Sequence, residues 1–360
     1  MRLVSLPLLR AILVAACGVL FCATVAQADN FIVNNSGWTH DAAPGNGTCA
    51  DSNGNCTLNA AIEEGNVRSG SHTITFSPAV LQVTLTGTLQ QLRAPFTITG
   101  NFPVRTILNG GGSFSCFDLT DSGDAPTGHA YNPMTGAGGA DGSTIANMVI
   151  QNCNSHGISA NGHGYTFINN FIGTNATGTG ALLNKGDGIS ISASRVYANE
   201  TNAFLQNLFG NFPGQPLDSS QITSFANQLD TLLSNAVLGP VHITNNVISG
   251  NQNNGVEVFS ENLAGVFIQG NMIGTDLTGS IAVPNGRNGI RFVGSPFANV
   301  IGPGNVISGN TWNGIDLAAG GVSLPNFIMG NRIGISATLP GANIGNGLSG
   351  ITVDSKPETA

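Results

Sequence analysis

The stretch Asn246–Val258 reads NVISGNQNNGVEV, and Asn305–Leu317 repeats it almost unchanged as NVISGNTWNGIDL. A longer unit with the pattern N-x-I-G begins at Asn170, Asn271 and Asn331, and its last two copies start 60 positions apart. Short and long units therefore alternate along the chain. This is the pattern of a repeat protein whose successive coils stack on one another.

Each unit contains an Asn, an apolar pair, a turn, and then Gly followed by Ile or Val and a short alternating run. Short strands separated by Gly and Asn corners favour a parallel β-solenoid, in which each strand pairs with the coils above and below. Stacked Asn side chains can also hydrogen-bond from coil to coil. We expect an all-β, right-handed parallel β-helix, since crossovers between parallel strands are right-handed.

Composition supports a β protein and argues against several partners. Charged residues make up only 8% of the 360 residues, and Gly accounts for 50 of them. The formal net charge is −8, and loss of Arg2 and Arg10 with a leader would take it to −10. An acidic surface gains no counterion release from nucleic acid or anionic lipid, so we expect neither as a partner.

The first residues have the form of a secretory signal. Arg2 and Arg10 precede an apolar run, and Ala26-Gln27-Ala28 has the small-x-small form of a cleavage site. We predict that residues 1–28 are a signal peptide cleaved near Ala28, which leaves a secreted or cell-surface protein. No later segment reaches the ~18 apolar residues of a transmembrane helix.

Four cysteines follow the predicted signal. Their spacing does not match zinc-ligand patterns, and an exported protein meets an oxidising compartment, so disulfides are expected. Cys49 and Cys56 would close a short loop. Cys116 and Cys153 either pair with each other or pack as small apolar residues.

The repeat period reveals an insertion. Val149 and Val247 are 98 residues apart, where one pair of units takes about 60. The extra segment, near 200–238, has a helical pattern in which Asp218 can cap and four apolar residues share a face: Ile222, Phe225, Leu229 and Leu232. A helical hairpin is expected, lying on the solenoid wall or acting as a lid or docking surface.

Residues 29–100 are expected to form an N-terminal cap with the first strands, and 101–360 the solenoid repeats. Cys56–Glu64 reads as a short helix with Thr57 as its N-cap. Such an apolar-faced helix can close the open end of the solenoid.

At this point the chain resembles a family, the exported bacterial proteins with a CSLREA-type N-terminal box followed by right-handed parallel β-helix repeats. The residues that match the box are Cys49, Cys56, Leu58, Ala61 and Ile62, with Thr73–Pro78 after them and the repeat Ile273–Gly279 later. Asn59 and Ala60 replace the Arg-Glu of the family box. The resemblance implies the fold and an exported protein, and it implies no activity.

Pectate lyases and polygalacturonases share the superfold, but a fold does not carry its chemistry with it. Polygalacturonase-like enzymes need clustered aspartates, Gly-His-Gly and Arg-x-Lys. This chain has Gly162-His163-Gly164 but no Asp-Asp pair and no Arg-Ile-Lys. We interpret Gly162–Gly164 as a turn.

Aligning the coils on the Gly-Ile/Val step places one residue of each coil in an outward-facing column. Its members are Ser159, Ser190, Glu257, Arg291, Asp316 and Thr352. Glu257 and Asp316 would lie two rungs apart, roughly 9 to 10 Å. Arg291 between them would lower the pKa of both carboxyls, whereas a general acid needs a raised pKa. We therefore expect an exposed ion-pair ladder rather than a catalytic pair.

The residue before that Gly forms a second column, which places His156 next to Asp187. A His–Asp pair with Ser190 nearby can position a general base, so these are the best catalytic candidates, although a corner accepts any short polar residue. Five phenylalanines are assigned to the core or to stacking rather than to a sugar platform: Phe114, Phe171, Phe259, Phe267 and Phe292.

The sequence favours an exported, non-catalytic β-helix that adheres to a polysaccharide or cell-surface component. The alternative is a polysaccharide lyase or glycoside hydrolase with an atypical site. No cofactor or metal is expected. A strand edge left open at the last repeat would also allow end-to-end self-association.

Overall fold

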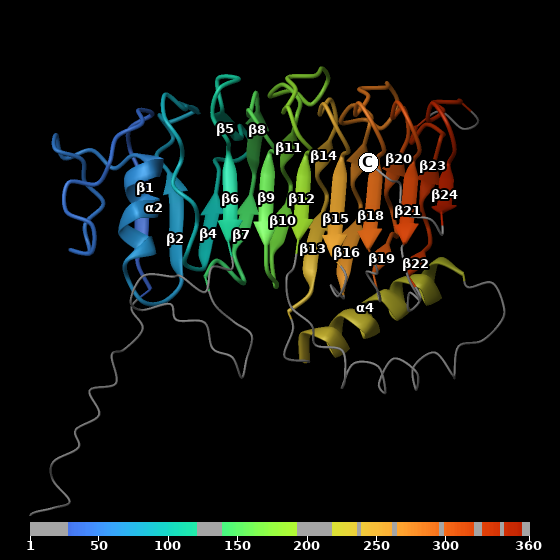
Figure 1. The fold of residues 1–360 in the computed structure, drawn as a ribbon, viewed down its shortest axis with the longest axis horizontal. Coiled ribbons are helices and arrows are strands. Elements are labelled where there is room, and N and C mark those ends of the chain that lie inside the picture. Colours follow the sequence, from blue (N-terminus) through green and yellow to red (C-terminus); the bar gives the residue numbers. More distant parts are fainter. Residues whose placement is uncertain are drawn as a thin grey trace, which may run out of the picture.

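A computed structural model describes residues 28–120, 139–192, 218–235, 239–260, 265–294, 299–319, 326–338 and 342–354. The predicted signal peptide, apart from Ala28, lies outside these ranges, as does the first half of the insertion. The described residues form three all-parallel sheets whose strands follow one another around the solenoid (Figure 1). The chain is a parallel β-helix, as the repeats predict, and the right-handed sense of its coils stays a prediction.

Sheet A contains nine strands: β1 (Asn30–Val33), β2 (His72–Phe76), β4 (Phe96–Thr99), β7 (Thr144–Ala146), β10 (Thr166–Ile168), β13 (Val241–Thr244), β16 (Val266–Gln269), β19 (Val300–Ile301) and β22 (Phe327–Ile328). Sheet B contains eight: β3 (Gln82–Thr84), β5 (Thr106–Asn109), β8 (Met148–Gln151), β11 (Phe171–Ile172), β14 (Val247–Ile248), β17 (Met272–Ile273), β20 (Val306–Ile307) and β23 (Arg332–Ile333). Sheet C contains seven: β6 (Phe117–Thr120), β9 (Ile158–Asn161), β12 (Ile189–Ser192), β15 (Val256–Ser260), β18 (Ile290–Gly294), β21 (Ile315–Ala319) and β24 (Ile351–Asp354).

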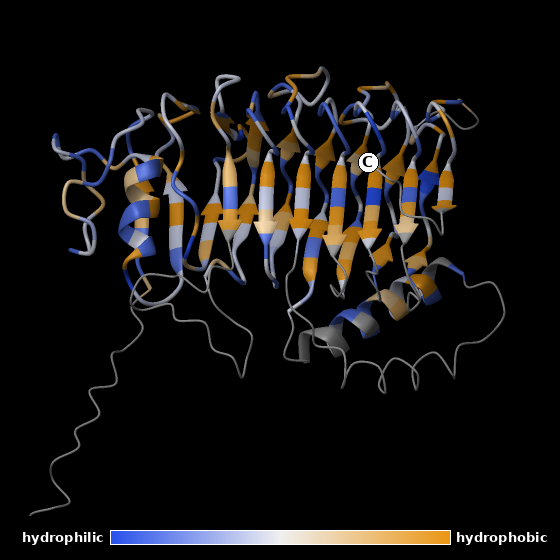
Figure 2. Cartoon of the chain, in the orientation of Figure 1, coloured by the Kyte–Doolittle hydropathy of each residue, from blue (hydrophilic) through white to orange (hydrophobic). Residues whose placement is uncertain are grey.

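The core runs along the solenoid axis as columns of aliphatic side chains. On sheet C the first inward position is fully buried in five successive coils, at Ile158, Ile189, Val256, Ile290 and Ile315. The residue after each of these faces outward, which Figure 2 shows as a polar band across the middle of the sheet C strands. The alternation of the sequence therefore separates core from wall as predicted.

Asparagine ladders hold the corners of successive coils together, also as predicted. One ladder contains Asn170, Asn246, Asn271, Asn305 and Asn331, and a second contains Asn184, Asn251, Asn285, Asn310 and Asn346. In each ladder the side-chain Nδ2 of one rung donates to the Oδ1 of the next. These bonds satisfy buried polar groups that a tight corner would otherwise leave unpaired.

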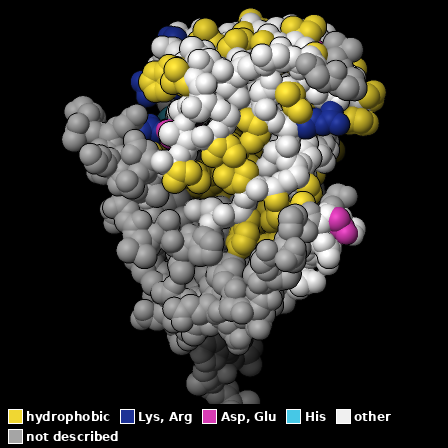
Figure 3. All heavy atoms as spheres, turned by 90° about the vertical axis from the view of Figure 1, so that its right-hand side faces the viewer, with side chains coloured by type: hydrophobic (Ala, Val, Ile, Leu, Met, Phe, Trp, Pro, Cys, Tyr) yellow, Lys and Arg dark blue, Asp and Glu magenta, His cyan; other side chains and the backbone are white. Residues whose placement is uncertain are grey.

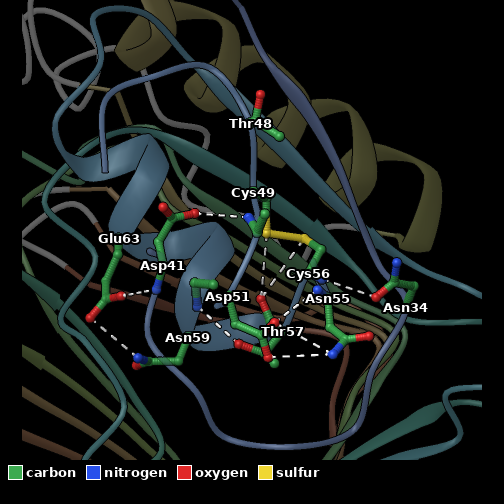
Figure 4. The surroundings of a disulfide bond; sticks show 12 residues. Asn34, Asp41, Thr48, Cys49, Asp51, Asn55, Cys56, Thr57, Asn59 and Glu63 are labelled. Atoms are coloured by element: carbon green, nitrogen blue, oxygen red, sulfur yellow. Dashed lines mark hydrogen bonds between the residues drawn. A yellow bond between two sulfur atoms is a disulfide. The ribbon is translucent and has the colours of Figure 1, made fainter. Parts of the chain in front are cut away.

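Helix α2 (Leu58–Asn66) closes the solenoid beside β1 and β2 (Figure 1). The Thr57 hydroxyl accepts a hydrogen bond from the Ala60 N–H and so caps the helix, and Leu58 and Ile62 are fully buried. The Cys49–Cys56 disulfide joins the preceding loop to the helix start (Figure 4). The predicted cap helix, its N-cap and this disulfide are all confirmed.

The second disulfide joins Cys116 to Cys153. Both residues are buried, and they lie just before β6 and just after β8. Of the two alternatives left by the sequence, pairing is therefore correct. Gly162–Gly164, between β9 and β10, is the turn that the sequence suggested.

Helix α4 (Ser219–Asn235) is the described part of the insertion. Asp218 caps it by accepting the N–H of Ser220 and of Gln221. The helix crosses the outer face of sheet A, because Asp230 lies 3.4 Å from His242 of β13 and the Phe225 ring meets Phe327 of β22 at 4.8 Å. The described half of the insertion therefore lies on the outer wall of the solenoid, which is one of the two predicted alternatives. The other half of the predicted hairpin lies outside the described residues.

The end of the solenoid opposite α2 presents apolar side chains (Figure 3). Leu348, Ile351 and Val353 are 68%, 45% and 74% exposed. Self-association through this end stays a prediction. No helix among the described residues is long and apolar enough to span a membrane.

Candidate functional site

The outer wall of sheet C carries the column that the sequence predicts. Strand pairing aligns its members in one row across the coils, in the order Asp118, Ser159, Ser190, Glu257, Arg291, Asp316 and Thr352. Asp118 of β6 extends the row by one coil beyond the prediction. Polar side chains from seven coils thus line one face of the solenoid.

The charged part of this column is an acid–base–acid ladder. Arg291 Nη1 lies 3.5 Å from Glu257 Oε1, and Arg291 Nε lies 3.5 Å from Asp316 Oδ2. The side chains of Arg291, Glu257 and Asp316 are only 16%, 22% and 10% exposed. The predicted ladder exists, but it is less exposed than expected.

The corner before sheet C holds a third ladder, and it begins with an aspartate instead of an asparagine. The N–H and Nδ2 of Asn254 both donate to Asp187 Oδ1, at 2.8 and 3.0 Å. Asn288 makes the same pair of bonds to Asn254, and the Asn313 N–H donates to Asn288. Asp187 therefore fills the position of an asparagine with a carboxylate that is 1% exposed.

The second oxygen of Asp187 lies where an asparagine would place its NH2 group. Asp187 Oδ2 is 3.1 Å from Nδ1 of His156, the corner residue of the preceding coil. The Asp187 N–H lies 3.0 Å from the same nitrogen. The predicted His–Asp neighbours are thus in contact, with His156 30% exposed and Asp187 buried behind it.

Glu257 connects the corner to the wall. The pKa of its carboxyl is raised to about 7 because burial, and then the negative charge of the neighbouring Asp187, disfavour ionisation. The charges of Arg291 and His156 act in the opposite direction but do not outweigh these two effects. Arg291 thus acts on the pKa of Glu257 in the expected direction, but the expected net lowering of that pKa is wrong, because burial and Asp187 outweigh it.

The pKa values of His156 and Asp187 shift in the directions expected of an ion pair. The hydrogen bond to Asp187 raises the pKa of His156, and the charges of Glu257 and Asp118 add to this effect. Burial acts to raise the pKa of Asp187, but the hydrogen bonds from His156 and Asn254 together lower it. At neutral pH the site thus holds an ionised Asp187 next to a Glu257 that retains a proton for much of the time.

The exposure of the aromatic side chains bears on whether this face could hold a sugar. Phe259, two residues after Glu257 on β15, is 59% exposed, so of the two alternatives, core or stacking, it is not in the core. Phe171, Phe267 and Phe292 are buried as expected, and Phe114 packs against the core.

At the corner, Trp312 is 38% exposed and lies 5.3 Å below the Arg287 guanidinium. The available signal for the exposure of Phe259 was its position two residues after the outward-facing Glu257, because successive side chains of a strand alternate between its faces.

The structure brings together His156, Asp187, Glu257, Arg291 and Asp316 of the sequence candidates, and Ser190 lies on the strand next to Glu257. Helix α4 lies on sheet A, so the described part of the insertion does not cover them. In the described ranges, no group of three or more His, Cys, Asp and Glu side chains is arranged to hold a metal ion.

Comparisons with protein-family models, with curated proteins and with solved structures found no match for this chain.

Proposed function

We propose that the protein is an exported β-helix of the CSLREA type that hydrolyses a polysaccharide lying across the outer face of sheet C, with Glu257 as the proton donor. The observation that carries the proposal is the pair of carboxyls, Glu257 and Asp316, that lie 3.5 Å on either side of Arg291 on this wall, with burial and the Asp187 charge raising the pKa of Glu257 to about 7. With a pKa of about 7, Glu257 holds a proton for much of the time at neutral pH. A protonated carboxyl that is partly exposed on a wall is the form that a general acid requires.

Two carboxyls of the ladder take separate roles in the reaction, Glu257 as general acid and Asp316 as general base. Glu257 gives its proton to the glycosidic oxygen as the bond from that oxygen to the anomeric carbon breaks. A water molecule forms the new bond to that carbon, and its proton passes to the Asp316 carboxylate. Glu257 then regains a proton from solvent, and Asp316 releases one.

Arg291 supports this division because it lies 3.5 Å from each carboxyl. Its charge stabilises the carboxylate that Glu257 becomes, and its Nε holds the Asp316 carboxyl on the same wall. Two rungs, about 9.6 Å, separate the backbones of Glu257 and Asp316, and both carboxyls contact Arg291, so the carboxyls lie closer together than this and fall in the range found in inverting glycosidases. We therefore expect inversion at the anomeric carbon.

The first test incubates the secreted protein with xylan, a β-glucan, polygalacturonate and alginate, and follows soluble products by mass spectrometry. Glu257→Gln and Asp316→Asn are each expected to reduce the rate at least ~100-fold, the contribution of a positioned acid or base. Asp276→Asn, which removes a carboxylate from the turn after β17, is the matched control and should retain full activity. Product formation that persists in Glu257→Gln would overturn the proposal.

A second candidate is binding without cleavage, which the 59% exposure of Phe259 beside the polar column favours. An exposed aromatic ring can stack on a sugar while neighbouring polar groups fix its orientation. Retention of a polysaccharide in affinity electrophoresis, with no shortened product, would support this candidate over hydrolysis. Unsaturated products would instead indicate elimination by a lyase.

A further inference from the structure

The outer face of sheet A has two halves of different chemistry. Helix α4 lies on the half formed by the later coils, where it contacts His242 of β13 and Phe327 of β22 (Figure 1). On the earlier strands β2, β4, β7 and β10, six of the eight outward positions are threonine, and the other two are Ala146 and Ile168. The six form what we call the threonine face: Thr73, Thr75, Thr97, Thr99, Thr144 and Thr166. None of the eight positions carries a charge or an aromatic ring.

The strand register arranges the threonine face as a two-dimensional array. One row crosses four neighbouring strands and contains Thr73, Thr97, Thr144 and Thr166. A second row, two residues farther along the strands, begins with Thr75 and Thr99. On β2 and β4 the residues between the rows, Ile74 and Ile98, are fully buried, which directs the threonines outward. Neighbours in the array are therefore about 4.8 Å apart from strand to strand and about 6.6 Å apart along a strand.

The hydroxyls of the threonine face are available to a ligand. In the described ranges none of the six makes a hydrogen bond, and Thr97 is exposed while the other five are partly exposed. A β-branched side chain is stiff at χ1, so each hydroxyl keeps a defined place. Strand propensity alone does not explain the face, because neighbouring strands of sheet C carry Asp118, Ser159 and Asn161 at outward positions.

The spacing of the array matches that of water in a tetrahedral lattice. An O–H···O hydrogen bond joins oxygens about 2.75 Å apart, so two waters bonded to the same neighbour lie about 4.5 Å apart at the tetrahedral angle. The perpendicular repeat, which spans two puckered layers of such a lattice, is about 7.3 Å by the same geometry. The strand spacing differs from the first repeat by about 0.3 Å, which adds up to about 1 Å over the row of four threonines. Along a strand the single step differs from the second repeat by about 0.7 Å.

We propose that the threonine face binds the surface of ice, with its hydroxyls taking the places of lattice waters. A hydroxyl both donates and accepts hydrogen bonds, as a lattice water does, so the array can continue the lattice without a charged group to disrupt it. Other ligands fit this face less well, because it offers no aromatic ring for a sugar to stack on and no cation for an anionic polymer. The inference goes beyond the proposed hydrolysis and uses a different sheet.

The test follows the growth of single ice crystals in a solution of the purified secreted protein during slow cooling. In the unmodified protein we expect faceted crystals and a gap between the melting and the freezing temperature. Thr97→Lys places a long charged side chain at the exposed position of the array, so the gap should be lost. Thr144→Lys, on the next strand, is a second variant with the same expectation. Thr84→Lys is the matched control, since Thr84 is an exposed threonine of β3 in sheet B, and it should keep the full gap.

Circular dichroism and the urea midpoint show whether each variant is folded, and the gap is measured without a glycan, so its outcome does not depend on hydrolysis. Rounded crystals with no gap in the folded, unmodified protein would overturn the inference. A gap that persists in both folded threonine-face variants, or that is lost equally in Thr84→Lys, would overturn the assignment to this face. If ice growth is unaffected and Thr97→Lys instead abolishes retention on an insoluble neutral polysaccharide, the face binds a glycan and not ice.

Discussion

At the scale of single residues, Glu257 makes stability depend on pH in a direction that can be checked. Its pKa is about 7 in the fold against an ordinary value of 4.5. The protonated form is thus favoured by folding, and this contribution is complete below pH 4.5 and lost as the pH rises to 7. Glu257→Gln, which cannot ionise, should therefore match the unmodified protein in acid and exceed it by about 3 kcal/mol above neutral pH.

Urea denaturation at pH 4.5 and pH 8.5 measures this difference directly. The matched control is Glu63→Gln, which removes a carboxylate from the N-terminal cap, far from sheet C. An equal stability gap between Glu257→Gln and the unmodified protein at both pH values would contradict the raised pKa.

The same residues show which contacts of the site could be predicted from the sequence. Repeat alignment predicted that Glu257, Arg291 and Asp316 share a column, and it predicted that His156 meets Asp187. It did not predict that the two columns meet at Glu257, because the direction of a corner side chain depends on backbone geometry. The available signal was Asp187, an aspartate in a column of asparagines. The second oxygen of an aspartate needs a hydrogen-bond donor nearby, whereas the NH2 group of an asparagine is itself a donor.

At the scale of elements, helix α4 covers the outer face of sheet A and not that of sheet C, and the outward-facing residues of the two sheets explain the difference. The outer column of sheet A contains His242, Phe267, Val300 and Phe327, and the middle two are fully buried. Sheet C carries polar residues at the equivalent positions and is left open in the described structure. The helical period of the insertion was readable from sequence, but the sheet it covers was not, because that choice depends on which outward column is apolar.

This arrangement predicts that α4 can detach without unfolding the solenoid. Phe225→Ala removes the ring that meets Phe327 edge-on at 4.8 Å, and such a contact contributes about 1 kcal/mol beyond the buried area of the ring. Amide hydrogen exchange across Ser219–Asn235 should accelerate while exchange in sheet C stays slow. Gln228→Ala, on the exposed side of the helix, is the control and should change neither. Equal acceleration in sheet C would show that helix and solenoid unfold as one unit.

At the scale of the whole molecule, each coil contacts only its neighbouring coils. The contribution of a ladder asparagine to the free energy of unfolding therefore depends on its place along the solenoid axis. Asn271 lies inside its ladder, where it accepts from Asn246 and donates to Asn305. Asn331 is the last described rung and contacts one neighbour of the ladder, Asn305. The fold class and the ladders followed from the repeat alone, whereas this gradient of burial along the axis required the structure.

The final prediction compares one chemical change at these two rungs. Asn271→Ala removes the acceptor of the buried Asn246 N–H and Nδ2 and the donor to the Ile243 carbonyl, at about 1–3 kcal/mol for each group left unpaired. Asn331→Ala, at a partly exposed rung with a single ladder neighbour, should cost clearly less. Urea denaturation followed by circular dichroism measures both. A larger cost for Asn271→Ala means that the ladder stabilises the solenoid through bonds between successive coils. Equal costs would mean that each asparagine acts only within its own corner.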